Sequence, residues 1–253
     1  MRFMKGSRYS GCLILVLALL TVMETGRLKA ASLSDLVRLQ DMPLSDIVTN
    51  LVVTDVNVNG QAYVFGGSTQ SSGYSEFSNT IRCFDAIQGQ WSVLPSTLPY
   101  NYSSDENHNA AIASNGKVYL SPGNGPGGEG SHNRIIEFDP TTGNAIERAA
   151  ITDDGSAIWG IAMAPAPATK GGVYLIGGWN GGGLSEIRHY DPDQDLVETV
   201  AYLTVGRTVG VRQAHPNGKI YLFGSNVGDF SVVEVFDPAD ETVRRIQNPQ
   251  GFL

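Results

Sequence analysis

Short apolar runs, each bounded by glycine, asparagine or proline, recur along the chain from about residue 50 onward. Four of these runs align on a tyrosine at their third position: Gln61-Ala-Tyr-Val-Phe-Gly-Gly67, Lys117-Val-Tyr-Leu-Ser-Pro-Gly123, Gly172-Val-Tyr-Leu-Ile-Gly-Gly178 and Lys219-Ile-Tyr-Leu-Phe-Gly-Ser225. Their tyrosines are 56, 55 and 47 residues apart. Runs of this length, rich in β-branched and aromatic residues, predict β-strands, and their regular return predicts a repeat architecture.

A tight-turn signal precedes each tyrosine run: Asn59-Gly60, Asn115-Gly116, Gly171-Gly172 and Asn217-Gly218. Both residues of such a dipeptide accept positive φ, which a two-residue type I′ hairpin turn requires. An apolar segment lies before each turn: Leu51–Val56, Ala110–Ala113, Ile158–Ala164 and Thr208–Ala214. We therefore predict that each repeat opens with a β-hairpin.

An aromatic residue followed by aspartate comes next in each repeat, at Phe84-Asp85, Phe138-Asp139, Tyr190-Asp191 and Phe236-Asp237. We expect the aromatic residue to end a third strand and the aspartate to accept hydrogen bonds from backbone amides in the turn just ahead. A fourth strand is predicted from the segments that follow: Trp91–Leu94, Ala145–Arg148, Leu196–Val200 and Thr242–Ile246. Four antiparallel strands of this length make one blade of a β-propeller.

The repeat resembles the kelch repeat, in which a strand ends in Gly-Gly and a tryptophan lies seven residues beyond the aromatic residue. The first copy has all of these residues, namely Gly66, Gly67, Phe84 and Trp91. The other copies keep only some of them, with Ala145, Val197 and Val243 at the tryptophan position. The resemblance implies an all-β, kelch-type β-propeller with four recognisable four-stranded blades, at roughly residues 50–95, 108–149, 157–201 and 207–247.

The number of blades is open, because the resemblance implies rings of six or seven. An additional N-terminal strand is predicted at residues 34–40, and none of the four blades accommodates it. Three arrangements fit: a propeller shortened by about two blades, a small ring with an extra strand, or an open arc that another chain completes. An open arc leaves unpaired strand edges, so it predicts self-association through those edges.

Residues 1–30 have the layout of a secretory signal peptide. Basic residues (Arg2, Lys5 and Arg8) precede the apolar run Cys12–Met23. That run has about a dozen residues, fewer than the roughly 20 that a membrane-spanning helix needs, so a signal anchor is the less favoured alternative. We predict cleavage after Ala30 and a secreted or periplasmic protein.

The propeller domain that remains, residues 31–253, is strongly acidic. The whole chain has a net charge of −8 and the leader contributes +4, which leaves −12 for the domain. Such a surface repels nucleic acid and anionic lipid, so we expect no nucleic-acid partner and no membrane contact beyond the leader. A protein or a glycan is the expected partner.

Cysteine and glycosylation signals add little chemistry. Cys12 lies in the leader, and Cys83 then remains alone in the domain, so no internal disulfide is expected. The strand pattern predicts that Cys83 is a buried, unreactive thiol. Asn101 begins the one N-glycosylation sequon, which is used only if the host is a eukaryote.

In a propeller, the loops between second and third strands share one face with the loops between blades, and we call this the loop face. It comprises Ser68–Thr80, Asn124–Arg134, Trp179–Glu186, Asn226–Ser231, Pro99–His108 and Asp153–Ala157. Loops on a rigid scaffold are the usual place for binding. The candidate ligand-binding residues on this face are Tyr74, Tyr102, His108, His132, Trp159, Trp179, Asn180 and Arg207. Aromatic side chains beside amides and charged groups suit sugars or peptide loops.

The leading hypothesis is a non-catalytic binding module. The alternative is a sugar-acting enzyme, since the resemblance extends to sialic-acid epimerases and, less favoured, to galactose oxidase. The four histidines (His108, His132, His189 and His215) do not have the spacing of zinc ligands, and the copper-ligand set of galactose oxidase is not recognisable. We therefore predict no catalytic residue, no metal site and no cofactor.

Overall fold

The computed structural model describes residues 51–55, 57, 59–71, 74–102, 109–123, 132–208, 211–224 and 232–246. All of them belong to one compact unit, Leu39–Leu253. The predicted signal peptide and the predicted strand at residues 34–40 lie outside the described residues.

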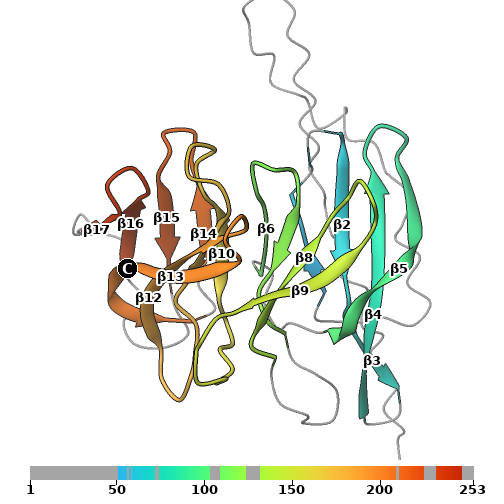
Figure 1. The fold of residues 1–253 in the computed structure, drawn as a ribbon, viewed down its shortest axis with the longest axis horizontal. Coiled ribbons are helices and arrows are strands. Elements are labelled where there is room, and N and C mark those ends of the chain that lie inside the picture. Colours follow the sequence, from blue (N-terminus) through green and yellow to red (C-terminus); the bar gives the residue numbers. More distant parts are fainter. Residues whose placement is uncertain are drawn as a thin grey trace, which may run out of the picture. The chain divides into compact units, whose positions relative to one another are not determined.

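The described residues form four antiparallel sheets, one for each predicted repeat (Figure 1). Blade 1 comprises β1 (Val52–Val53), β2 (Gln61–Phe65), β3 (Ser68–Ser71), β4 (Tyr74–Asp85) and β5 (Gln90–Tyr102). Blade 2 comprises β6 (Ala110–Ile112), β7 (Val118–Leu120), β8 (Arg134–Phe138) and β9 (Ala145–Ala150). Blade 3 comprises β10 (Ala162–Pro165), β11 (Val173–Ile176), β12 (Leu184–Asp191) and β13 (Leu196–Arg207). Blade 4 comprises β14 (Val211–Ala214), β15 (Ile220–Phe223), β16 (Val233–Asp237) and β17 (Thr242–Ile246).

Strand order follows the sequence in blades 2, 3 and 4, as the repeat predicts. Blade 1 differs, because β3 pairs with the first half of β4 and turns part of the predicted loop Ser68–Thr80 into a hairpin. Its core order is otherwise β1, β2, β4 and β5. The prediction of an all-β, kelch-type architecture with four-stranded blades is confirmed, and none of the described sheets closes into a barrel.

The hairpin turns differ from the predicted type. In blade 2 the Gly116 amide donates to the Ala113 carbonyl, and the Ala113 amide donates to the Lys117 carbonyl. Gly116 has φ +79°, whereas among described non-glycine residues only Asp195 and Glu241 have positive φ. This is the three-residue loop that ends in a glycine bulge, and the hairpins of blades 1 and 4 close with the same two bonds, so the type I′ prediction is wrong for the three Asn-Gly turns. In blade 3 the loop is longer, with the Ala166 amide donating to the Gly172 carbonyl, and Gly171 and Gly172 both have positive φ.

Asparagine in these turns acts through its side chain instead. Asn115 Oδ1 accepts the Lys117 amide at 3.0 Å, and Asn115 Nδ2 donates to the Tyr119 hydroxyl at 2.9 Å. Asn217 makes the same two contacts in blade 4, with Lys219 and Tyr221. The asparagine therefore ties the turn to the tyrosine of its own repeat.

The aspartate of the aromatic-Asp pair behaves as predicted. A carboxylate oxygen of each accepts the amide two residues ahead, at 2.8–3.2 Å; the aspartates are Asp85, Asp139, Asp191 and Asp237. Four residues after each aspartate the backbone has positive φ, and the residues there are Gly89, Gly143, Asp195 and Glu241. The turn between third and fourth strands therefore has one backbone design in all four blades.

Aromatic pairs join the blades. The tyrosine of one repeat packs edge to face on the aromatic residue of the next, in Tyr63–Phe138, Tyr119–Tyr190 and Tyr174–Phe236, with ring centroids 4.9–5.3 Å apart. Three core clusters surround these pairs, one at each boundary between consecutive blades. The spacing of the repeat therefore sets the packing between blades as well as the strands within them.

The Gly-Gly signature has a steric cause. Gly67 N donates to the Tyr102 carbonyl and Gly178 N to the Arg207 carbonyl, both at 2.9 Å. A Cβ on Gly66 would lie 2.1 Å from Tyr102 O, and a Cβ on Gly177 would lie 2.5 Å from Arg207 O. The end of the long fourth strand therefore crosses the glycines at backbone contact, which only glycine permits.

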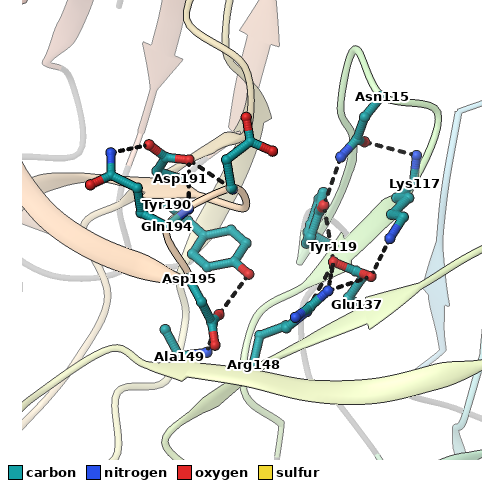
Figure 2. A network of polar contacts seen from close by, with 11 residues as sticks. Asn115, Lys117, Tyr119, Glu137, Arg148, Ala149, Tyr190, Asp191, Gln194 and Asp195 are labelled. Atoms are coloured by element: carbon teal, nitrogen blue, oxygen red, sulfur yellow. Dashed lines mark hydrogen bonds and ion pairs between the residues drawn. The ribbon is translucent and has the colours of Figure 1, made fainter.

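Figure 2 shows a polar network that links blades 2 and 3. Asp195 Oδ1 accepts both the Tyr190 hydroxyl and the Ala149 amide of blade 2, each at 2.9 Å. Next to it, the buried carboxylate of Glu137 accepts Lys117 Nζ at 2.6 Å and two nitrogens of Arg148 at 3.0 Å. Polar side chains thus fix the outer part of the boundary that aromatic residues fill further in.

Candidate functional site

Two of the eight candidate ligand-binding residues lie partly or wholly outside the described part of the chain. His108 is among the residues that the structure does not describe. Tyr74 begins β4, and nothing is described of its side chain. Their roles stay predictions. Asn101, the predicted glycosylation site, is an exposed residue near the end of β5.

Tyr102 and Arg207 connect adjacent blades. They end the long strands β5 and β13, and their side chains are 0% and 3% exposed. The Tyr102 hydroxyl donates to the Ser121 carbonyl of blade 2 at 2.9 Å. The Arg207 guanidinium donates to the Gly224 carbonyl at 2.9 Å and forms an ion pair with Glu234 of blade 4. Neither presents its polar end to solvent, contrary to the open-loop position expected for them.

His132 lies against an aromatic ring of blade 1. Its imidazole stacks on Tyr100, with ring centroids 3.4 Å apart and planes 14° from parallel. Burial is the main reason why the pKa of the Tyr100 hydroxyl is raised. Beside His132, the Asn133 amide exchanges hydrogen bonds with the backbone of Thr152 at 2.8 and 3.2 Å. This part of the loop face is tightly packed and partly buried.

The two tryptophans form the open part of the loop face. Trp159 N donates to Trp179 O at 3.1 Å, and Trp179 N donates to Trp159 O at 2.6 Å. The two residues are thus an isolated antiparallel bridge between the loop before β10 and the loop after β11. Trp159 is 52% exposed and Trp179 is partly exposed. A single exposed aromatic side chain is ordinary on a protein surface. What distinguishes Trp159 is that backbone hydrogen bonds hold it opposite a second tryptophan.

Backbone contacts clamp the loop that carries Trp179. Trp179 also forms a β-bridge with Gly183, and the backbone N–H of Asn180 donates to Gly182 O at 3.1 Å. On the other side, Gly206 of β13 lies so close that a Cβ there would meet Gly183 O at 2.2 Å. Asn180 itself is exposed. The segment predicted as an open loop, Trp179–Glu186, is therefore a rigid turn that leads into β12 at Leu184.

Sequence reasoning missed the residues that aim Trp159 outward. Ile158 and Ile161 on either side of it are each 1% exposed and belong to the core between blades 2 and 3. Their signal was present, since both are β-branched and lie in a loop otherwise rich in small residues. The sequence predicts a strand over the whole segment Ile158–Ala164, whereas β10 begins only at Ala162.

The remaining chemistry of the described residues is limited. They contain no group of three or more His, Cys, Asp and Glu side chains placed to hold a metal ion. Cys83 is buried as predicted, and burial is the main cause of the raised pKa of its thiol. In the part of the chain that the structure describes, no helix has the length and apolar character to cross a membrane.

Comparison with known families supports the repeat assignment. Residues 53–97 match the family model of the Kelch motif. The match covers blade 1 from the second residue of β1 to within β5. A search of curated proteins found no significant match to this chain. Blade 1 therefore matches the Kelch motif, and the described residues, which form antiparallel sheets without a helix, are consistent with an all-β fold of the kelch-propeller type.

Proposed function

We propose that the protein is an exported, non-catalytic binding module that holds a protein or glycan partner on its loop face. Kelch propellers generally mediate protein interactions, and the Kelch motif suggests the same kind of role here. The single observation that carries the choice of surface is the bridged tryptophan pair, which exposes Trp159 on a backbone fixed by hydrogen bonds. Tryptophan is the residue type most enriched among energetic centres of interfaces.

The backbone that carries the tryptophans is held by hydrogen bonds and core contacts, which favours a binding role over that of an ordinary exposed loop. Ile158, Ile161 and the Trp179–Gly183 turn are held before any partner arrives. Binding then orders few groups, which keeps the entropic cost of association low. Export is supported by the leader-like residues 1–30 and by the acidic domain that follows them.

A cross-linking experiment tests the surface. A photoreactive phenylalanine analogue placed at Trp159 in the native host should capture a partner, and the same analogue at Tyr202 should not. Tyr202 is the control because it is 65% exposed but lies within β13, paired with Glu186 of β12, and is not part of the tryptophan bridge. Equal capture from both positions, or capture from neither, would contradict the proposed surface. Mass spectrometry of the N-terminus in the exported fraction tests cleavage after Ala30.

A further inference from the structure

We propose that the Trp159–Trp179 surface is a subsite for a neutral carbohydrate, one or two pyranose rings in size. This rests on the proposed function and names the ligand class of the same surface. Three features carry it: the direction of the two indoles, the rigidity of their backbone, and the absence of charge in the segments that hold them.

Both indoles leave the bridge on one side. Trp159 and Trp179 exchange both backbone hydrogen bonds, so they are a directly opposed antiparallel pair. Side chains of such a pair project to the same face, with Cα atoms about 5.5 Å apart. The flanking Ile158 and Ile161 are buried in the core, which leaves Trp159 to point away from it. The result is a pair of indoles that start from a fixed backbone on one side of the bridge.

Glycines keep the approach to this surface open. A Cβ built on Gly181 or Gly182 would meet no atom within 4 Å. The turn beside Trp179 therefore has no side chain at these two positions, and a flat ring can approach the indole across it without a steric barrier. A large side chain at either position would fill this space.

The two segments that carry the tryptophans hold no charged side chain, and the nearest charges along the chain are Asp154 and Glu186. Residues 156–161 and 177–185 contain no Asp, Glu, Lys, Arg or His. Asn180 is exposed, and its amide offers both a donor and an acceptor. A hydroxyl group is likewise both donor and acceptor, so sugar hydroxyls can pair with both the NH₂ group and the carbonyl oxygen of the Asn180 side chain. A charged peptide side chain would find no counter-charge within either segment.

These groups match the two kinds of surface that a pyranose has. Its C–H face is apolar and packs on an indole, while its equatorial hydroxyls require directional hydrogen bonds from groups such as the Asn180 amide. Apolar contact supplies most of the binding and a few placed polar groups supply selectivity. The same surface has nothing that would select an acidic sugar.

The test is titration of the exported chain with defined sugars. Binding is monitored by tryptophan fluorescence and, separately, by calorimetry. The probes are methyl β-galactoside, methyl β-glucoside, methyl α-mannoside, N-acetylglucosamine, lactose and cellobiose, with glucuronic acid as the charged comparison. At least one neutral sugar should bind saturably with a Kd at or below about 1 mM. Trp159→Ala should weaken that binding at least ~10-fold, and Asn180→Ala should weaken it roughly 5-fold. Tyr202→Ala should leave it unchanged.

Three results would overturn the inference: no saturable binding up to about 10 mM, equal binding by Trp159→Ala, or tighter binding of glucuronic acid than of any neutral sugar. Because Trp159 is half exposed, its replacement is compatible with folding, and the thermal midpoint checks this. A protein partner captured at Trp159 without any sugar binding would leave the proposed function standing and remove this inference. Sugar binding accompanied by turnover would do the reverse, since it supports the subsite and contradicts a non-catalytic module.

Discussion

At the scale of single residues, Gly66 and Gly177 show why the first glycine of the Gly-Gly pair tolerates so little change. Gly66 and Gly177 combine positive φ with a carbonyl at 2.1 and 2.5 Å from where a Cβ would lie. Gly116 also has positive φ but has nothing within 4 Å of its Cβ position. Alanine at Gly66 or Gly177 would therefore be disfavoured by both the left-handed conformation and the nearby carbonyl. Alanine at Gly116 would be disfavoured by the conformation alone.

Replacing Gly177 by alanine should lower the free energy of unfolding by about 2–5 kcal/mol, since the left-handed conformation costs about 1–2 kcal/mol and overpacking against Arg207 O adds about 1–3. Gly116→Ala is the matched control and should cost only the conformational part. Urea unfolding of both variants measures the difference. Equal losses in the two variants would show that close approach contributes nothing.

His189 provides a residue-level prediction about pH. Its Nε2 lies 2.8 Å from the Gly171 carbonyl, and its ring packs 5.4 Å from Tyr174. Burial lowers the pKa of His189 below the ordinary 6.5; the Gly171 hydrogen bond opposes this, Lys170 adds to it, and Asp191 and Glu241 oppose it. The unfolded chain then binds the proton more strongly than the folded chain. Stability should therefore fall as pH drops from 6.5 toward the lowered folded value and should be insensitive to this group above 6.5.

His189→Gln should remove that part of the pH dependence while keeping a side-chain donor near Gly171. The measurement is the free energy of unfolding at intervals between pH 7.5 and about pH 5. A His189→Gln variant with an unchanged slope would assign the pH dependence to other groups.

At the scale of elements, the turns between third and fourth strands do more than reverse the chain. The fourth residue after each aspartate has positive φ in every blade, and in blades 3 and 4 that residue contacts the preceding blade. Asp195 of blade 3 accepts the Ala149 amide of blade 2, and Glu241 of blade 4 forms an ion pair with Lys170 of blade 3. One backbone conformation thus places a carboxylate at each of these two boundaries.

Asp195→Ala should destabilise the protein by about 2–4 kcal/mol, because the buried Tyr190 hydroxyl loses its acceptor and alanine is strained at φ +51°. Asp195→Asn should cost much less, since asparagine tolerates this conformation and keeps an acceptor oxygen. Denaturant unfolding ranks the variants, and hydrogen exchange of the Ala149 amide reports on the lost contact between blades. Equal destabilisation by both changes would mean that negative charge, rather than geometry and an acceptor, is what Asp195 supplies.

At the scale of the whole molecule, the faces of the blades are not equally covered. Phe65 of blade 1 and Ile176 of blade 3 are 0% and 2% exposed, because the next blade packs on them. The corresponding Phe223 of blade 4 is 42% exposed, and Ile246 on the same face is 41% exposed. They flank Val233 in a cross-strand row, and no further sheet among the described residues covers that row. An open arc predicts self-association through its unpaired strand edges, and this exposed face of blade 4 offers a second surface at which two copies could meet.

Phe223→Lys should shift the protein toward monomer in sedimentation velocity, because a charge on the row opposes apolar contact between copies. Ile87→Lys is the control, since Ile87 is 82% exposed in a turn of blade 1 and should leave association unchanged. Wild-type protein that stays monomeric up to about 100 μM would contradict self-association through this row.

The amino-acid pattern by itself determined the repeats, the order of strands within a blade and the role of the turn aspartates. These depend on interactions between residues close in the chain, such as Asp85 with the amides of the next turn, so local spacing is enough to predict them. It also named Trp159, Trp179 and Asn180 as candidate binding residues, and the structure leaves all three partly or largely exposed. It misjudged the hairpin type, since a type I′ turn and a three-residue loop with a glycine bulge both use an Asn-Gly pair.

Only the tertiary structure decided which candidates face solvent. Tyr102 lies in a predicted loop and Arg207 at the predicted start of blade 4, yet the neighbouring blade buries both of them and supplies their hydrogen-bond partners. Trp159 stays open because Ile158 and Ile161 anchor its backbone to a core built from two blades. Contacts between blades join residues far apart in the chain, so the spacing within one repeat predicts the recurring aromatic pairs but not which loop residues a neighbouring blade covers.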